Sequence, residues 1–182
     1  MSKKIFIILF SLFISASYEY SQNNKTVQIN FDYTKREGFS SNQIAIWLEN
    51  ANGNYIKTIY ITDFTGKRAG WKKRNQSLSN WQKKANAIKM SQTEIDSVSK
   101  ATPKQGNVNI IWNCKDNNGK FVKDGNYKIV VEATIYQDNN VLYTAEINIG
   151  DKANSQIAIP KYSKSEAKDI DIIKNVKVSF NP

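Results

Sequence analysis

Residues 43–62 read QIAIWLENANGNYIKTIYIT, two runs rich in β-branched and aromatic residues on either side of Asn52 and Gly53. Asn-Gly is the preferred pair for a two-residue turn whose twist matches that of antiparallel strands. Each run also has the length and the residue types of a strand. The stretch therefore predicts a β-hairpin, and with it an antiparallel β protein.

Further strand patterns lie on both sides of this hairpin. TVQINFDY, residues 26–33, alternates apolar and polar residues, which is typical of a strand with one buried face. Similar runs are NVNIIWNC (107–114), NYKIVVEATIYQ (126–137), VLYTAEINIG (141–150) and NVKVSFN (175–181), with turns expected at 115–125 and at Asn139-Asn140. Short strands joined by turns predict a mainly β, immunoglobulin-like antiparallel β-sandwich. We expect Trp112 to be buried between its sheets, with Tyr127 nearby.

The first residues have the pattern of an export signal. Two lysines precede IFIILFSLFI at 5–14, and small residues follow up to Ser21, as in the basic, apolar and small-residue regions of a signal peptide. An apolar run of ten residues is too short to span a bilayer. The sequence predicts a signal peptide at 1–21, a single β-sandwich domain at 22–182, and a periplasmic or extracellular protein whose mature form has no membrane span.

The composition restricts the chemistry. The chain has no histidine and one cysteine, Cys114. The absence of histidine excludes Ser-His-Asp and Cys-His catalysis and histidine-based zinc sites, and a single cysteine excludes an internal disulfide. Cys114 falls in an apolar strand pattern, where a thiol is usually a small buried side chain. We expect no catalytic residues, no metal site and no enzymatic activity.

Positive charge is concentrated between the two groups of strands. The formal net charge is +10, and an insertion at roughly 66–106, with a short helix, separates the strand groups. Between residues 67 and 89 the insertion has no acidic residue but contains Lys67, Arg68, Lys72, Lys73, Arg74, Lys83, Lys84 and Lys89. Because an exported protein seldom meets nucleic acid, we expect an anionic surface, a phosphorylated cofactor or an acidic protein as its partner.

Two interpretations of the basic segment are open. In one, it is a solvated, mobile loop. In the other, Trp71 or Trp81 stacks on a flat ring such as isoalloxazine, while cations neutralise a phosphate. The cations expected to bind the anion are Lys67, Arg68, Lys72, Lys73 and Arg74. An anionic lipid or polysaccharide fits the same residues.

The insertion ends in SQTEIDSVSKATP, residues 91–103. Ser91 and Glu94 have the spacing of a capping box, which predicts a helix of about two or three turns. We expect Pro103 and Gly106 to end this helix. In the simplest interpretation, IDSVSKATP is only the end of this helix.

Two resemblances concern the strands. IWNCKDNNGKFVKDGNYKIVVEA, residues 111–133, is similar to the immunoglobulin-like domain of flagellar hook-capping proteins through Trp112, Asp116, Gly119, Val122, Gly125 and Tyr127. This likeness implies a fold and not a function. A wider set of blocks, at 44–74, 101–106 and 110–133, resembles the periplasmic family called domain of unknown function 2271.

A third resemblance concerns DSVSKAT, residues 96–102. It is similar to the motif Asp-x-x-Ser/Thr-Gly-Ala-Thr of exported flavoproteins, matching at Asp96, Ser99, Ala101 and Thr102 and differing at Lys100. The resemblance implies that a flavin transferase attaches FMN to Thr102 through a phosphodiester, with Asp96 and Ser99 shaping the turn. It also implies electron exchange with a membrane reductase. The alternative is a cofactor-free binding or assembly module that docks an anionic surface or partner, as a hook-cap-like domain would.

Overall fold

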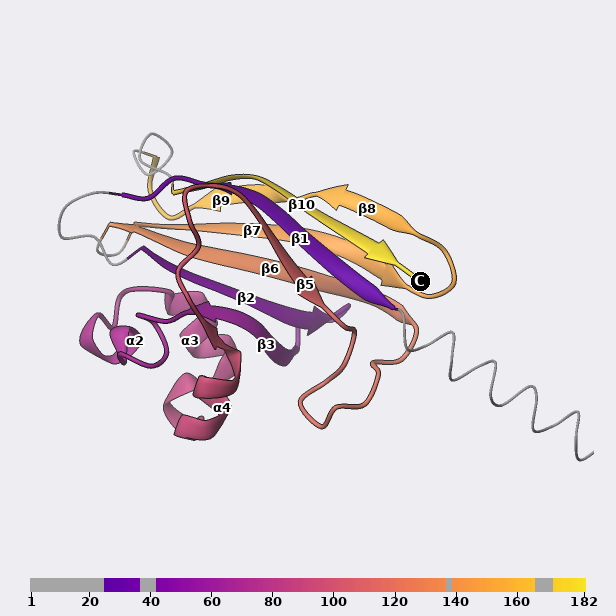
Figure 1. The fold of residues 1–182 in the computed structure, drawn as a ribbon, viewed down its shortest axis with the longest axis horizontal. Coiled ribbons are helices and arrows are strands. Elements are labelled where there is room, and N and C mark those ends of the chain that lie inside the picture. Colours follow the sequence, from indigo (N-terminus) through magenta and orange to yellow (C-terminus); the bar gives the residue numbers. More distant parts are fainter. Residues whose placement is uncertain (1–24, 37–41, 137–138, 166–171) are drawn as a thin grey trace, which may run out of the picture.

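The computed structural model describes residues 25–36, 42–136, 139–165 and 172–182. Two β-sheets pack against each other, and short helices lie beside β2 and β3 of one of them (Figure 1). The expected signal peptide lies outside the described residues. Among the described residues, no helix has both the length and the apolar character needed to cross a bilayer.

The first sheet, sheet A, has four strands in the order β5 (Gly106–Trp112), β1 (Thr26–Tyr33), β10 (Ile173–Asn181) and β8 (Asn154–Ile157). Sheet B has six, in the order β4 (Ser99–Lys100), β3 (Tyr55–Thr62), β2 (Gln43–Asn50), β6 (Gly125–Tyr136), β7 (Asn139–Ile149) and β9 (Ile159–Tyr162). Neighbouring strands are antiparallel except β3 and β4, which pair in parallel. The mainly β prediction with two sheets is confirmed, and the finer immunoglobulin-like arrangement stays a prediction.

The main core lies between the two sheets, because one face of each strand is apolar. In β1, Val27, Ile29, Phe31 and Tyr33 are all buried, as the period-2 alternation predicts. Trp112 is also buried, as predicted, and its Nε1 donates to the Lys115 carbonyl oxygen at 2.9 Å. Tyr127 is only partly buried but packs against the same core.

A second core covers the opposite face of sheet B. The insertion folds into α2 (Gly70–Lys73), α3 (Ser79–Ala85), the 3-10 helix η1 (Ala87–Lys89) and α4 (Gln92–Val98). Its apolar residues pack on outward-facing residues of β2, β3 and β6, namely Ala45, Trp47, Ile61 and Val130. These alternate along the strands with residues of the main core, so sheet B is covered on both faces. The insertion is therefore a folded layer, and its interpretation as a solvated loop is wrong.

Polar contacts between the insertion and sheet B accompany this packing. The buried Glu132 carboxylate of β6 accepts the Trp81 backbone N–H at 2.8 Å and the Asn80 side-chain amide at 2.9 Å. Lys84 Nζ lies 3.1 Å from the Glu49 carboxylate of β2. These bonds satisfy groups that would otherwise be costly to bury.

The hairpin of β2 and β3 forms as predicted, although its turn differs. The Gly53 N–H donates to the Asn50 carbonyl oxygen at 2.9 Å, so Ala51 and Asn52 are the central turn residues. Gly53 follows with a φ of 79°, which glycine adopts without strain. The turn is therefore centred on Ala51 and Asn52 and followed by a left-handed glycine, and it is not a two-residue turn with Asn52 and Gly53 at its centre.

Other local predictions need correction. Asn139 and Asn140 belong to β7 and not to a turn, and residues 137–138 lie outside the described residues. Cys114 is buried as expected, but it follows β5 with a left-handed φ of 56° instead of lying in the strand. The short strands β4, β8 and β9 were not anticipated, because four residues or fewer give little periodicity.

Candidate functional site

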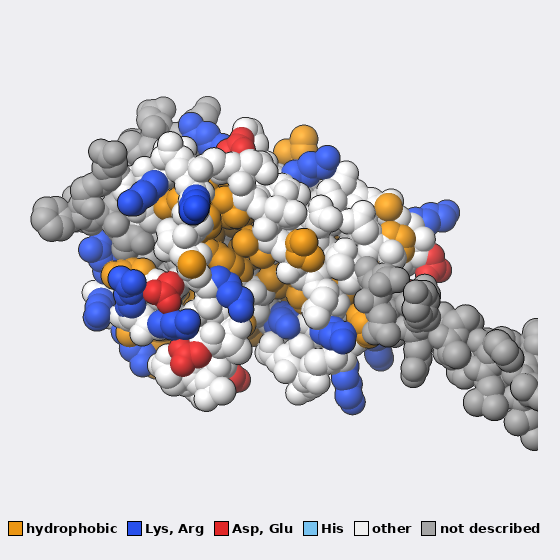
Figure 2. Space-filling model, viewed as in Figure 1, with side chains coloured by type: hydrophobic (Ala, Val, Ile, Leu, Met, Phe, Trp, Pro, Cys, Tyr) orange, Lys and Arg blue, Asp and Glu red, His pale blue; other side chains and the backbone are white. Residues whose placement is uncertain are grey.

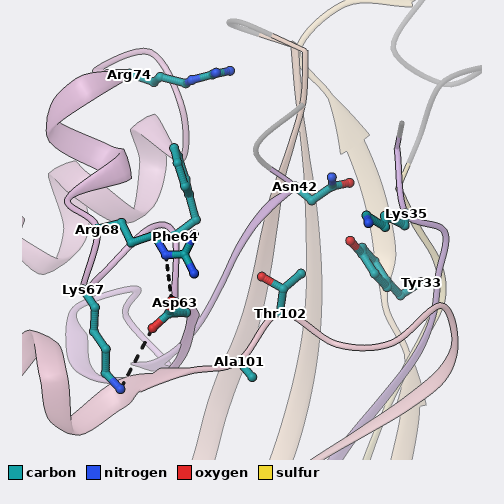
Figure 3. Close-up of a pocket in the computed structure, with 10 residues that line it drawn as sticks. All are labelled: Tyr33, Lys35, Asn42, Asp63, Phe64, Lys67, Arg68, Arg74, Ala101 and Thr102. Carbon is teal, nitrogen blue, oxygen red and sulfur yellow. Dashed lines mark hydrogen bonds and ion pairs between the residues drawn. The ribbon is translucent and has the colours of Figure 1, made fainter. Parts of the chain in front are cut away.

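A cleft of about 650 Å³ opens between the insertion and the adjoining ends of β1, β2 and β4 (Figure 3). Four separate segments contribute to its lining: Tyr33 and Lys35; Asn42; Asp63, Phe64, Lys67, Arg68 and Arg74; and Ala101 and Thr102. We call it the Thr102 cleft. Its size falls within the range of small-molecule sites.

Thr102 reaches this cleft because the segment before it is fixed to sheet B. Ser99 and Lys100 pair in parallel with Ile61 and Thr62 of β3. The Tyr60 hydroxyl, also from β3, then donates to the Ala101 carbonyl oxygen at 3.1 Å. The Thr102 side chain is exposed and lines the cleft, so its hydroxyl is open to a reagent from outside.

The helix-end interpretation of IDSVSKATP is right for its first half only. Ser91 caps α4, and its hydroxyl and the Glu94 backbone and side chain form the predicted capping box. The helix ends at Val98, and the chain continues through β4 to the cleft. Pro103 and Gly106 therefore do not end the helix, because it gives way to β4 before either residue.

Two other motif residues, Asp96 and Ser99, lie outside the cleft lining. Asp96 is exposed on α4 and accepts a hydrogen bond from the Gln92 side chain at 2.9 Å. Ser99 is buried, and its hydroxyl donates to the Ile95 carbonyl oxygen at 2.7 Å. Ser99 thus fixes the bend from α4 into β4, whereas the Asp96 side chain bonds within α4 and its backbone carbonyl oxygen accepts the Ser99 N–H. Lys100 lines a neighbouring groove instead of the Thr102 cleft.

Cations dominate the charge of the cleft. Four basic residues and one acidic residue line it. The Asp63 carboxylate lies 3.1 Å from Arg68 Nε and 4.0 Å from Lys67 Nζ. These are exposed pairs, which contribute little to stability, but they hold two cations along one wall. Such a cleft attracts anions.

Aromatic side chains stand on opposite sides of the cleft. Phe64 lies on the side of the insertion, with the Arg74 guanidinium carbon 5.9 Å from its ring centroid. Gly70 permits this placement, because a Cβ there would lie 2.4 Å from the Phe64 ring. Tyr33 lies on the opposite side, at the end of β1 (Figure 3).

Trp71 and Trp81 are not part of the cleft. Both are buried in the second core, with ring centroids 6.4 Å apart in an edge-to-face arrangement. Trp81 Nε1 donates to Thr58 Oγ1 at 3.0 Å. Because neither indole presents an open face, they do not form the stacking platform that the sequence suggested.

The basic cluster is divided by the fold. Lys67, Arg68 and Arg74 line the Thr102 cleft, together with Lys35, which the sequence did not single out. Lys72, Lys73, Lys83 and Lys89 are exposed elsewhere on the insertion, and Lys72 Nζ lies 5.1 Å from the Trp71 ring centroid. Figure 2 shows several Lys and Arg side chains gathered over the helical side of the molecule.

Sequence reasoning missed Tyr33, Lys35, Asn42, Asp63 and Phe64 as cleft residues. They come from segments far apart in the chain and share no local motif. Tyr33 falls on the inward face of its strand, so its alternation indicates a core residue only. The one available signal was the position of Lys35 and Asp63 just after predicted strands, where sites commonly lie.

The described residues give little support for a metal site or for a reactive thiol. Within these ranges, no three His, Cys, Asp or Glu side chains come together as they would around a metal ion. Burial raises the pKa of the Cys114 thiol to about 12, so the reactive thiolate is scarce at neutral pH.

Comparison with known proteins gives one match. Residues 24–167 match the family model described as predicted periplasmic protein, domain of unknown function 2271. Neither the curated proteins nor the solved structures give a match. Because the matched region covers most of the chain, this protein belongs to the domain of unknown function 2271 family of predicted periplasmic proteins.

Proposed function

We propose that this protein is a non-enzymatic accessory protein that carries FMN covalently on Thr102 and exchanges electrons with a membrane reductase. The observation that carries the proposal is the exposed Thr102 hydroxyl in a cleft lined by cations and aromatic rings. Covalent attachment suits an exported carrier, because a dissociable flavin would be lost by dilution outside the cytoplasm.

The cleft residues fit the two parts of FMN. Lys35, Lys67, Arg68 and Arg74 supply positive charge for the phosphate, and arginine in particular favours phosphate oxygens. Phe64, which is partly exposed, supplies apolar surface for the ring system. This arrangement differs from the one expected from the sequence, because the aromatic residue is not a tryptophan.

Thr102 would take part in attachment as a nucleophile. Its Oγ forms a bond to the FMN phosphorus of FAD, the pyrophosphate P–O bond breaks, and AMP leaves. The hydroxyl proton passes to a base of the flavin transferase, because Asp63, the carboxylate in the cleft lining, is paired with Arg68 and Lys67. The chain's own part is to present the hydroxyl and to hold the product, while the flavin supplies the redox chemistry.

Lys100 departs from the flavinylation motif but does not strain the chain. Residue 100 lies in the extended strand β4 and is not among the described residues with positive φ. A glycine is therefore not required there by the protein's own backbone. Its exposed side chain leaves the Thr102 cleft open, since it lines the neighbouring groove.

Co-expression with a flavin transferase tests the proposal. In-gel fluorescence and intact mass should detect an FMN adduct on the parent protein and on Thr102→Ser, which keeps a hydroxyl. The adduct should be absent from Thr102→Ala. Ser97→Ala is the matched control, because Ser97 is an exposed hydroxyl of α4 outside the cleft. An adduct that persists in Thr102→Ala, or no adduct on any form, contradicts the proposal.

A second candidate is a cofactor-free module that docks an anionic surface or an acidic protein. The observation in its favour is that Lys72, Lys73, Lys83 and Lys89 are exposed, and none forms a salt bridge with another described residue. Reversal of Lys72, Lys73 and Lys83 to Glu should then weaken retention on an anionic matrix and reduce its salt dependence. Unchanged retention would contradict a docking role.

A further inference from the structure

The Tyr33 hydroxyl is buried without a partner. The residue is 1% exposed, and no hydrogen-bonding group in the described part of the chain reaches its hydroxyl oxygen. Buried polar groups in folded proteins nearly always have a partner. Among the described residues only one other buried side-chain atom, Asn139 Oδ1, shares this condition.

Neighbouring tyrosine hydroxyls have partners. Tyr60 donates to the Ala101 carbonyl oxygen at 3.1 Å, and Tyr143 donates to the Ile173 carbonyl oxygen at 3.0 Å. Backbone carbonyl oxygens thus satisfy both of these tyrosine hydroxyls. Tyr33 differs in that it lines the Thr102 cleft, and Figure 3 shows its hydroxyl directed toward the interior of that cleft.

The hydroxyl has the properties of a neutral donor. Burial raises the pKa of Tyr33 above its ordinary value, so the proton stays on the oxygen at neutral pH. The surroundings favour an anionic acceptor, because Lys35, Lys67, Arg68 and Arg74 line the same cleft. Phosphate oxygens in protein sites accept hydrogen bonds from both neutral and charged donors, and the cleft contains both kinds.

We infer that the Tyr33 hydroxyl donates a hydrogen bond to a phosphate oxygen of the ligand in the Thr102 cleft, and that the cleft binds a phosphate monoester without covalent attachment. The identity of the ligand as FMN rests on the proposed function. Tyr33 is a positioning residue here, because it holds the phosphate group and takes no part in bond formation at Thr102.

Free flavins provide the test in a Thr102→Val background, which cannot form the adduct. Fluorescence quenching should show that FMN binds more tightly than riboflavin, which lacks the phosphate. Tyr33→Phe should weaken FMN binding by about tenfold or more, the loss expected for one hydrogen bond to a charged group. Riboflavin binding should change little, and inorganic phosphate should compete with FMN less well in Tyr33→Phe.

Tyr143→Phe is the matched control. It also removes one buried hydroxyl, but its bond goes to the Ile173 carbonyl oxygen and Tyr143 is not in the cleft lining. Its FMN-to-riboflavin affinity ratio should stay at the parent value. Tyr33→Phe should not lower the thermal midpoint of the ligand-free protein, because the lost hydroxyl had no partner. A large fall in that midpoint would overturn the inference.

Two other results would also overturn the inference: equal weakening of FMN and riboflavin by Tyr33→Phe, or no FMN binding by the Thr102→Val protein. These failures are distinct from failure of the proposed function. Non-covalent FMN binding that depends on Tyr33, without any adduct on the parent protein, would contradict covalent attachment alone. An adduct on Thr102 with no effect of Tyr33→Phe on FMN binding would contradict the role of Tyr33 alone.

Discussion

Gly66 lies so close to Ser99 that a Cβ at residue 66 would be 1.8 Å from Ser99 Oγ. Ser99 belongs to β4, where it pairs with Ile61 of β3, and it lies three residues before Thr102. The start of the insertion and the acceptor segment, residues 99–102, therefore fit together only because residue 66 has no side chain. The position of Thr102 depends on this contact.

Gly66→Ala should displace β4 and, with it, the acceptor segment. We expect a loss of about 1–3 kcal/mol in the free energy of unfolding, as for other overpacked sites, together with less FMN adduct per protein. Denaturant unfolding and intact mass measure the two effects. Gly150→Ala is the control, because a Cβ there would lie 3.3 Å from its nearest neighbour, Asn148 Oδ1, and residue 150 is far from the cleft residues in sequence. Equal adduct yield in both variants would count against the coupling.

Trp81→Ala should destabilise the whole domain. Trp81 is fully buried between the insertion and sheet B, and truncation of a buried aromatic typically costs about 3–5 kcal/mol. Trp112→Ala, in the main core, should cost a similar amount. Chemical denaturation monitored by circular dichroism gives both values. A Trp81→Ala midpoint equal to that of the parent would mean that the insertion does not contribute to the folded core.

Glu132 should make stability fall as pH rises above the ordinary glutamate range. Burial raises the pKa of Glu132, although hydrogen bonds from Trp81 and Asn80 oppose the shift. Because the folded state then holds its proton at a higher pH than the unfolded state, the contribution of Glu132 to stability is fully present below the ordinary pKa of 4.5 and is lost as the pH rises through the raised folded pKa. Denaturant midpoints from pH 4 upward, in parent and Glu132→Gln, give the test. The parent should lose stability relative to the variant; a constant difference would contradict the shift.

Cleft cations should matter more for phosphate binding than the other cations of the insertion. Arg68→Gln and Arg74→Gln should each weaken FMN binding to the Thr102→Val protein several-fold and reduce its salt dependence, because each removes a charge that lines the cleft. Lys83→Gln and Lys89→Gln remove the same charge outside the lining. Titrations at two salt concentrations compare the four. Similar losses in all of them would indicate a general effect of net charge.

Export should be accompanied by cleavage near Ser21. The basic start and the apolar run at 5–14 motivate this expectation, which agrees with the description of the family as periplasmic. N-terminal sequencing of protein from its native host should give a first residue between Tyr18 and Gln22. An intact Met1 in a cytoplasmic fraction would contradict it.

Sequence patterns predict those parts of the fold that depend on local order. The alternation in 26–33 and the Ser91-Glu94 pair have local physical causes, one-sided burial and helix capping, and the structure contains both. The turn at Gly53 was less predictable, because both hairpin types accept Asn-Gly. The prediction that Trp71 and Trp81 stack on a ligand was wrong. Lysines around a tryptophan suggest an exposed segment, and the sequence does not show that sheet B buries these two side chains.

The site was only partly predictable for the same reason. Thr102, Lys67, Arg68 and Arg74 could be proposed from a short motif and a charge cluster, and the fold brings them into one cleft. Tyr33 and Phe64 reach that cleft through strand register and through the close approach of Gly70. Neither has a local signal, so they could be found only from the structure.

The two-sided burial of β2 has a consequence for the history of the chain. Seven of the eight residues of this strand are buried, and its apolar residues alternate between two different cores. A relative without the helices of the insertion would expose Ala45, Trp47, Ile61 and Val130 to solvent as one apolar surface. Loss of the insertion would thus have to be accompanied by polar replacements across three strands. Such a coordinated change is hard to reach one substitution at a time, so we expect the layer and the outer face of the sheet to be inherited together.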